Sequence, residues 1–369
     1  MKIAFDHQTF THQSYGGISR YYTTLAAELL LLGKDARVFA GFHRNKYLAG
    51  LPRPNVRGVN IGYYPPKTWR PLHLLNHTLT QVHINSWGAD IVHETYYSSL
   101  PRLGSKVMRV TTAHDMIHEI FRDDFPVNDK TTMHKKRTFE RVDHIISISN
   151  STKRDLLKYF DVDESKISVV HHGVDVEKYQ AHIDHEPRQR PYFLYVGARG
   201  GYKNFRSVLR ALACSRSLKK EFDLIAFGGG KFSSEEVRLI SELGFKNAQV
   251  EQIAGCDDVL VGLYRQAVAF IYPSLYEGFG LPPLEAMAAG CPVICSNSSS
   301  MPEVVNNAGE YFDPTCYESM AGVIEKVAFS SDLRSELIKA GYVNVNKFSW
   351  ANCAQETMSI YNQLLDVSE

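Results

Sequence analysis

The chain has 369 residues, of which 44% are hydrophobic, 22% charged and 11% aromatic, a globular composition that excludes a disordered or fibrous chain. At roughly 100 to 200 residues per domain, this length predicts two domains, each large enough to bury its own core. The 41 Lys and Arg residues nearly balance the 40 Asp and Glu residues, so we expect no nucleic-acid partner.

The N-terminal segment Met1–Asp6 turns polar too soon for a signal peptide and favours a first strand. The longest apolar stretch, Leu25–Leu32, contains Glu28 and is far shorter than the roughly 18 residues that cross a bilayer, so we expect no membrane-spanning helix. The six cysteines include no Cys-x-x-Cys pair, which suggests buried thiols in a reducing compartment. We therefore expect a cytoplasmic protein.

Short apolar, β-branched runs alternate with helical patterns along nearly the whole chain, which is typical of parallel sheets with crossover helices. In the first half, a helix is predicted over 18–32 because apolar residues line one broad face and Gly33 follows. The predicted strands of this half are Lys2–Asp6, Ala36–Ala40, Asp90–Glu94, Lys106–Ala113, His144–Ser149 and Ile167–His171.

The polar, proline-flanked stretch His182–Pro191 predicts a linker, after which the alternation repeats. The strands predicted beyond it are Tyr192–Val196, Asp223–Phe227, Ala248–Gln252, Val268–Tyr272 and Pro292–Cys295. The fold class is therefore α/β, with a second Rossmann-like unit in the second half.

The stretch 276–290, with the sequence YEGFGLPPLEAMAAG, is the most informative motif. It turns through Gly278 and Gly280 into a helix whose first turn contains prolines, and such a helix N-terminus predicts an anion site. Glu277 and Glu285 bracket this site. Carboxylates repel phosphate but accept two hydrogen bonds from a vicinal diol, so they suit sugar hydroxyls. The alternative is a solvated loop residue and a favourable charge at a helix N-terminus.

A second glycine-rich loop, 197–204, follows the predicted strand Tyr192–Val196 and contains Arg199 and Lys203. Two cations past the carboxyl end of a strand can neutralise a pyrophosphate. An ordinary charged surface loop is the alternative. The spacing is not G-x-G-x-x-G, which disfavours a nicotinamide dehydrogenase, and Gly228–Lys231 lacks the remaining residues of a P-loop.

Two weaker motifs lie in the first half. Gly16 and Gly17 open the first long helix, where the backbone can approach a ligand closely. His114 follows an apolar strand and can donate to a hydroxyl or a phosphate, although a histidine at this place is more often structural.

Metal sites are not expected. The pairs His73/His77 and His114/His118 have helical spacing but no recognisable third ligand in sequence. The D-x-D string at residues 161–163 is better explained by turn and capping chemistry. We expect neither a metal nor another cofactor.

Together these motifs resemble glycosyltransferase family 4, the retaining GT-B enzymes of group 1. Residues 277–285 are similar to the E-x7-E motif of that family, and the supporting motifs occur in the family's order along essentially the whole chain. The supporting motifs are Gly16-Gly17, His114-Asp115, residues 149–153, Arg199 with Lys203, and Phe348-Ser349-Trp350.

The resemblance implies two facing Rossmann-like domains with a deep cleft between them. The acceptor domain would comprise residues 1–185, with the final helix in 351–369 crossing back to it, and the nucleotide-sugar domain residues 186–350. The implied catalytic residues are His114, Arg199, Lys203 and Glu277. The implied donor-binding residues are Gly16, Gly17, Gly278, Phe279, Gly280, Leu281 and Glu285.

By the same resemblance, Glu285 holds the ribose and Glu277 the donor sugar, while Arg199 and Lys203 stabilise the diphosphate leaving group. His114 contacts the transferred sugar. The departing phosphate accepts the acceptor's proton, so no separate base is needed.

The opening segments 5–8 and 15–21 resemble bacterial polysaccharide mannosyltransferases, which implies GDP-mannose as donor and a glycan or a polyprenyl-diphosphate-linked oligosaccharide as acceptor. Residues 63–75 mix aromatics, leucines and cations, as an anchor on the cytoplasmic face of the inner membrane would, but a packed loop and helix also fit. A UDP-sugar or another GDP-sugar as donor, a nucleotide-sugar 2-epimerase and a catalytically silent sugar-nucleotide sensor remain alternatives.

Overall fold

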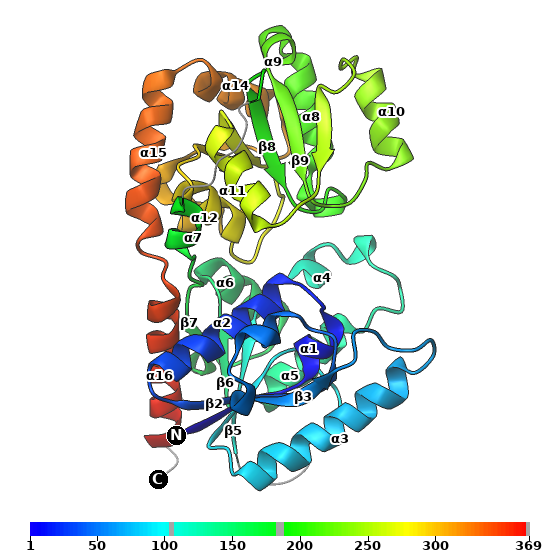
Figure 1. Cartoon of the computed structure of the whole chain (residues 1–369), viewed down its shortest axis with the longest axis vertical. Coiled ribbons are helices and arrows are strands. Elements are labelled where there is room, and N and C mark those ends of the chain that lie inside the picture. Colours follow the sequence, from blue (N-terminus) through cyan, green and yellow to red (C-terminus); the bar gives the residue numbers. More distant parts are fainter. Residues whose placement is uncertain (103–106, 182–187, 367–369) are drawn as a thin grey trace. The chain divides into compact units, whose positions relative to one another are not determined.

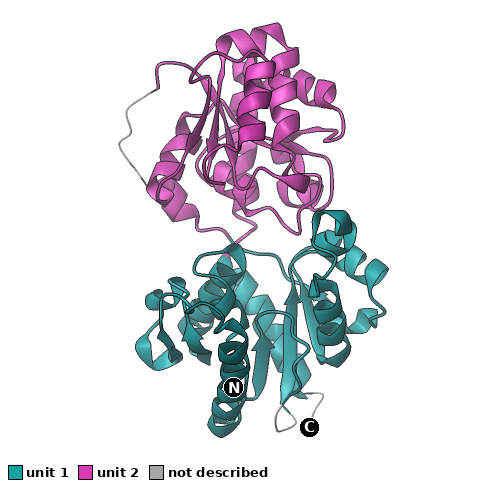
Figure 2. Cartoon of the chain, turned by 90° about the vertical axis from the view of Figure 1, so that its right-hand side faces the viewer, with its two compact units in different colours: residues 1–173, 350–369 teal, residues 174–349 magenta. Residues whose placement is uncertain are grey.

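The computed structural model describes residues 1–102, 107–181 and 188–366. The chain divides into two compact units, shown in separate colours in Figure 2. Unit 1 comprises Met1–Gly173 and Trp350–Glu369, and unit 2 comprises Val174–Ser349. The change of unit therefore falls before α7 (Val176–Gln180), which packs on a helix of unit 2. The predicted boundary at residue 185 lies outside the described residues.

Unit 1 is built on a seven-stranded parallel sheet of order β3-β2-β1-β4-β5-β6-β7 (Figure 1). Its strands are β1 (Lys2–Phe5), β2 (Asp35–His43), β3 (Val56–Asn60), β4 (Ile91–Glu94), β5 (Met108–Ala113), β6 (His144–Ser147) and β7 (Ile167–Val169). Its helices are α1 (Gln8–His12), α2 (Gly17–Leu31), α3 (Trp69–Trp87), α4 (Ile117–Ile120), α5 (Thr131–Arg141), α6 (Asn150–Tyr159) and α16 (Trp350–Asp366).

Unit 2 contains a six-stranded parallel sheet of order β10-β9-β8-β11-β12-β13. Its strands are β8 (Tyr192–Val196), β9 (Asp223–Phe227), β10 (Val250–Ile253), β11 (Ala269–Tyr272), β12 (Val293–Ser296) and β13 (Gly309–Phe312). Besides α7, its helices are α8 (Phe205–Cys214), α9 (Arg216–Glu221), α10 (Ser234–Glu242), α11 (Asp257–Gln266), α12 (Leu281–Ala288), α13 (Met301–Val305), α14 (Tyr317–Ala328) and α15 (Ser331–Val345).

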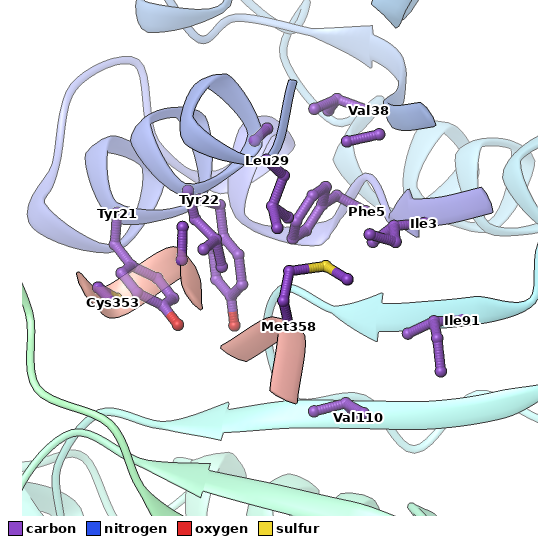
Figure 3. Close-up of a cluster of buried hydrophobic side chains, with 14 of the residues drawn as sticks. Ile3, Phe5, Tyr21, Tyr22, Leu29, Val38, Ile91, Val110, Cys353 and Met358 are labelled. Carbon is purple, nitrogen blue, oxygen red and sulfur yellow. The ribbon is translucent and has the colours of Figure 1, made fainter. Parts of the chain in front are cut away.

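The period-2 alternation of strand side chains explains why helices cover both faces of the sheet in unit 1. Ile3 and Phe5 of β1 belong to the core formed with α2 and α16, whereas Ala4 between them packs in the cluster that includes Ile84 of α3. Figure 3 shows Met358 of α16 beside Phe5 within the first of these cores. The final helix thus completes the core of the unit in which the chain begins.

Each sheet has one point where the strand order reverses. In unit 1, β1 and β4 are neighbours, and the chain winds outward from them in opposite directions. In unit 2 the same holds for β8 and β11. In open parallel sheets, ligands bind outside the carboxyl ends of the strands at such a point. The loops after these four strands are therefore the expected positions of a ligand-binding site.

Two expectations need correction. The edge strands β3 and β13 were absent from the sequence prediction. Not all thiols are buried: Cys214 and Cys256 are exposed, whereas Cys291, Cys295 and Cys353 are buried. Within the described ranges, no helix combines the length and hydropathy that crossing a bilayer requires.

Candidate active site

The site in unit 2 is formed by the loops that follow β8 and β11. Backbone and side-chain bonds join these loops directly: Leu275 N donates to Tyr202 O at 2.8 Å, and the Asn204 amide donates to Pro273 O at 3.1 Å. Asn204 adopts a left-handed conformation at the start of α8, with φ of 58°. Two motifs more than 70 residues apart are therefore held together at the switch point of the sheet.

An ion pair connects the two motifs. Lys203 Nζ lies 2.6 Å from Glu277 Oε1, and their side chains are 20% and 11% exposed. The ammonium also lies 5.8 Å from the centre of the Tyr272 ring. The Tyr272 hydroxyl donates to the Glu277 carboxylate. Burial and this carboxylate raise the pKa of Tyr272, so that Tyr272 stays a hydrogen-bond donor. Glu277 thus has two protein donors that fix its position.

The turn from Glu277 into α12 depends on a glycine and on two serines. Gly280 precedes the helix with φ of 113°, a conformation that side chains disfavour. Ser300 Oγ donates to Glu277 O at 2.9 Å and to Phe279 O at 2.7 Å, while Glu277 N donates to Ser299 Oγ at 2.9 Å. The turn therefore directs the N-terminus of α12, with no acidic residue in its first turn, into the site.

The other donor-binding candidates lie along the same turn and helix. Gly278 and Phe279 are part of the turn, and Leu281 begins α12. Glu285 lies within α12 and is 6% exposed, so the two glutamates are on either side of the glycine turn. The structure brings Lys203, Glu277 and this turn together in unit 2.

Arg199 has a different environment from the one the sequence suggested. Its Nε donates to Glu236 Oε1 at 2.7 Å, and its side chain is only 4% exposed. Its terminal nitrogens donate to the carbonyls of Gly228, Gly230 and Lys231 at 2.9 to 3.0 Å. Arg199 therefore supports the Gly228–Lys231 loop with its charge balanced by Glu236, and Lys203 is the cation that contacts the Glu277 motif.

The remaining candidates belong to unit 1. Gly16 caps α2 and Gly17 begins it. A Cβ on Gly16 would approach the Gln13 amide to 2.3 Å, whereas one on Gly17 would contact nothing within 4 Å. The close approach at Gly16 involves a flexible side chain, so its packing alone does not require glycine at either position.

His114 follows β5 and is 6% exposed. Its Nε2 has no hydrogen-bond partner among the described residues, and its ring packs against Tyr21, Tyr22 and His172. Burial lowers the pKa of His114 to about 4, so the ring is neutral at pH 7. A neutral imidazole with an uncommitted nitrogen suits a hydroxyl group.

The D-x-D string has a structural role. Asp163 accepts a hydrogen bond from Ser165 N at 2.9 Å and caps a short 3-10 helix. Among the residues that the structure describes, no group of three or more His, Cys, Asp or Glu side chains is arranged to hold a metal ion.

Several site residues escaped the sequence analysis. Asn204, Tyr272, Ser299 and Ser300 hold Lys203 and the 277–280 turn in place, as the bonds above show. The only available signal was position: Asn204 and Tyr272 lie at the junctions of a strand or a helix with a motif loop, and the serines follow β12.

Comparisons with known proteins identify the family of the chain. Residues 15–178 match the family model for glycosyltransferase family 4, and residues 179–344 match the model for glycosyl transferases group 1. The two models together cover most of the chain.

Individual relatives are more distant. The chain is 29% identical to O-antigen chain mannosyltransferase B of Escherichia coli, over 99% of this chain and 100% of that protein. It is 27% identical to the serotype-specific mannosyltransferase WbdA of E. coli, over 75% of this chain but only 36% of that longer protein. Sucrose-phosphate synthase from Thermosynechococcus elongatus superposes with a TM-score of 0.77 at 19% identity, with both chains fully covered. The chain therefore belongs to the glycosyltransferases that combine a family 4 domain with a group 1 domain, and it has the GT-B fold.

Proposed function

We propose that the protein is a retaining, metal-independent mannosyltransferase that moves mannose from GDP-mannose to a glycan or lipid-linked glycan in bacterial surface polysaccharide synthesis. The observation that carries the proposal is the Lys203–Glu277 pair beside the N-terminus of α12. The names of the relatives, O-antigen chain mannosyltransferase B above all, support mannose and a polysaccharide acceptor.

Each group of the unit 2 site has a role in this reaction. Glu277 accepts hydrogen bonds from the donor sugar and Glu285 from the ribose, as carboxylates do from diols. Lys203 and the positive end of α12 stabilise the diphosphate, on which negative charge develops as the glycosyl–phosphate bond breaks. Arg199 keeps the Gly228–Lys231 loop in position.

The residues of unit 1 complete the proposal. Gly16 and Gly17 allow the first loop to approach the phosphates, and neutral His114 hydrogen-bonds the transferred sugar. The acceptor's oxygen forms the new bond to the anomeric carbon on the face that the diphosphate leaves. The leaving phosphate oxygen takes the acceptor's proton, so the charges balance without a protein base.

A donor panel tests the function. Purified protein is incubated with GDP-mannose, GDP-fucose, UDP-glucose or UDP-galactose, with and without a mannose-containing acceptor, in the presence of EDTA. Release of GDP from GDP-mannose only when acceptor is present, with an α-linked product by NMR, is expected. Turnover without acceptor would instead indicate an epimerase. Turnover of a UDP-sugar alone would show that the donor is that UDP-sugar and not GDP-mannose.

We also propose that unit 1 makes peripheral contact with the inner membrane, since the proposed acceptor is lipid-linked. Tyr63, Leu74 and Leu75 are 71%, 56% and 44% exposed, and residues 61–88 contain no acidic residue. Such a surface suits anionic lipid. Trp69 does not belong to it, because its ring packs against Tyr64 with centroids 5.2 Å apart.

Vesicle co-sedimentation tests the contact. Replacing Tyr63, Leu74 and Leu75 together by Ser should abolish binding to phosphatidylglycerol vesicles, with GDP-mannose affinity unchanged. The matched control replaces exposed apolar residues of unit 2, Val237 and Phe329, by Ser. If both variants and the unchanged protein bind the vesicles equally, unit 1 does not make the proposed membrane contact.

A further inference from the structure

The switch point of the sheet in unit 1 contains a group of aromatic rings that the sequence analysis did not connect. His7 follows β1 and Tyr96 follows β4, the two strands at which the order reverses. Asp6 ties the two loops together: its Oδ1 accepts from Thr95 N at 2.9 Å and from Thr95 Oγ1 at 2.7 Å. The general rule for open parallel sheets makes this edge a ligand-binding position.

Five side chains from three segments meet there, and we call them the histidine–aromatic cluster: His7, His12, Trp69, His73 and Tyr96. Ring centroids are 5.6 Å apart for His7 and His73, 4.7 Å for His12 and Trp69, and 5.7 Å for His12 and Tyr96. The Trp69 and His73 rings are 5.6 Å apart with their planes 19° from parallel. The His7 side chain is buried, with 1% of its surface exposed, whereas the other four side chains are half-buried or exposed.

The cluster contains buried polar atoms that the described residues do not satisfy. Neither ring nitrogen of His7 has a hydrogen-bond partner in the described part of the chain, and the same is true of His73 Nδ1. Its neighbour His77 differs, because its Nε2 lies 2.8 Å from Pro101 O and must donate to that carbonyl. Buried polar groups are nearly always hydrogen-bonded, so these nitrogens need a polar partner, which a bound water or a ligand hydroxyl supplies.

The charge state of the rings indicates which polar ligand. Burial and the neighbouring imidazoles lower the pKa of His7 well below its usual value. Partial desolvation, with His73 and Arg44 close by, lowers the pKa of His12 to about 4. The charged groups near the histidines are Arg44, beside His12, and Asp6, beside His73, and the Asp6 carboxylate is occupied by Thr95 and Gln8. Near Tyr96 the charged groups are the carboxylates of Asp115, Glu119 and Asp129. Neutral imidazoles offer one donor and one acceptor each, which matches a hydroxyl group better than a phosphate.

From these observations we infer that the histidine–aromatic cluster binds a saccharide unit of the acceptor through its hydroxyl groups. The half-buried rings of Trp69 and Tyr96 give the apolar surface, and the imidazoles give the few placed polar groups, that small-molecule sites combine. The inference rests on the proposed function for the existence of a glycan acceptor. It adds which residues recognise that glycan, and that they contact its hydroxyls and not its diphosphate.

NMR titration of the intact protein tests the inference. The imidazole C–H signals are followed while α-mannotriose, chitobiose, α-galactobiose or inorganic pyrophosphate is added. We expect at least one saccharide to shift the signals of His12 and His73, and pyrophosphate to leave them unchanged. The inference is wrong if no saccharide shifts them, or if pyrophosphate displaces the saccharide that does.

Variants separate the cluster from the donor site. Trp69→Ala and His73→Ala should weaken binding of that saccharide about tenfold or more, the loss expected for one aromatic contact or one hydrogen bond. His83→Ala, an exposed histidine on the same helix, is the matched control and should bind like the unchanged protein. Equal affinity in all three variants would overturn the inference.

GDP-mannose binding, measured by calorimetry on the same variants, distinguishes the two proposals. It should be unchanged in the cluster variants and lost in Lys203→Ala. If GDP-mannose binds but the cluster variants bind the saccharide as well as the unchanged protein does, the cluster is not the acceptor site and the proposed function stands. Saccharide binding at the cluster without GDP-mannose binding would support the cluster and reject GDP-mannose as the donor.

Discussion

The ammonium of Lys203 lies 2.6 Å from a carboxylate oxygen of Glu277, although the two residues are 74 positions apart in the chain. The contact exists because β8 and β11 are neighbours and their following loops share backbone and side-chain bonds. In the proposed reaction the two residues have different roles: Lys203 contacts the diphosphate and Glu277 contacts the sugar. The pair holds both side chains in position before the donor binds.

A double-mutant cycle measures this coupling. Lys203→Ala and Glu277→Gln should each lower kcat/KM about 100- to 1000-fold, since each removes a preorganised group at the reacting centre. The double variant should lose less than the product of the single effects, because each single variant leaves its partner unpaired. GDP release gives the rates.

The control for this cycle is Lys326→Ala, which breaks the more exposed Lys326–Glu310 pair of 2.8 Å on the same unit. It should leave the rate within about twofold, since exposed ion pairs contribute little. Strict additivity of the Lys203 and Glu277 effects would contradict a functional pair.

Arg199 should affect stability more than a surface arginine does. Arg199→Ala removes a buried cation and leaves Glu236 and three carbonyls without their donor, so unit 2 should lose about 3 to 5 kcal/mol of unfolding free energy. Arg206→Ala breaks the exposed Arg206–Glu235 pair and should cost less than about 1 kcal/mol. Urea unfolding followed by circular dichroism compares them. Similar losses of unfolding free energy in both variants would show that Arg199 does not support the Gly228–Lys231 loop.

The strands of the two cores were predictable because they are buried, short and largely apolar. Tyr192–Val196 and Asp223–Phe227 have the same bounds in the sequence prediction and in the structure. The edge strand β3 was missed because it contains Arg57 and Gly58 and is largely exposed, so it lacks an apolar pattern. The other missed edge strand, β13, has only four residues and begins with glycine.

Within the candidate site, sequence could suggest residue types but not pairings. The glycine turn into α12 predicted a helix N-terminus directed at a ligand, and this depends only on local chain geometry. Which carboxylate each cation meets depends on strand order: Lys203 meets Glu277, whereas Arg199 meets Glu236 on α10. His7 and His73 likewise come together only because α3 packs beside the loop after β1.

Gly280→Ala should disrupt the turn that directs α12 into the site. Gly280 has φ of 113°, and an added Cβ would lie 2.4 Å from Met301 Cε. Met301 can move, but the backbone strain stays, at a cost of roughly 1 to 3 kcal/mol. GDP-mannose affinity by calorimetry should therefore fall, together with the melting temperature.

Gly322 provides the matched control for Gly280. It lies in α14, and a Cβ there would contact nothing within 4 Å. Gly322→Ala should therefore stabilise the protein by about 0.5 to 1 kcal/mol through helix propensity and leave GDP-mannose binding unchanged. Wild-type affinity in Gly280→Ala would show that the turn tolerates a side chain and that its conformation does not matter for the donor.

Acidification should destabilise unit 1 through His93. This side chain is fully buried, with Nδ1 2.6 Å from the Tyr361 hydroxyl and Nε2 2.9 Å from Thr112 Oγ1, and burial lowers its pKa to about 3. The unfolded chain binds a proton near pH 6.5 and the folded chain does not, so this stability is present above pH 6.5 and falls as the pH decreases toward 3. The slope is about 1.4 kcal/mol per pH unit. In urea unfolding between pH 6 and 4, His93→Gln should lose that part of the slope, whereas exposed His83→Gln should keep it; equal slopes in both would show that His93 protonates in the folded state.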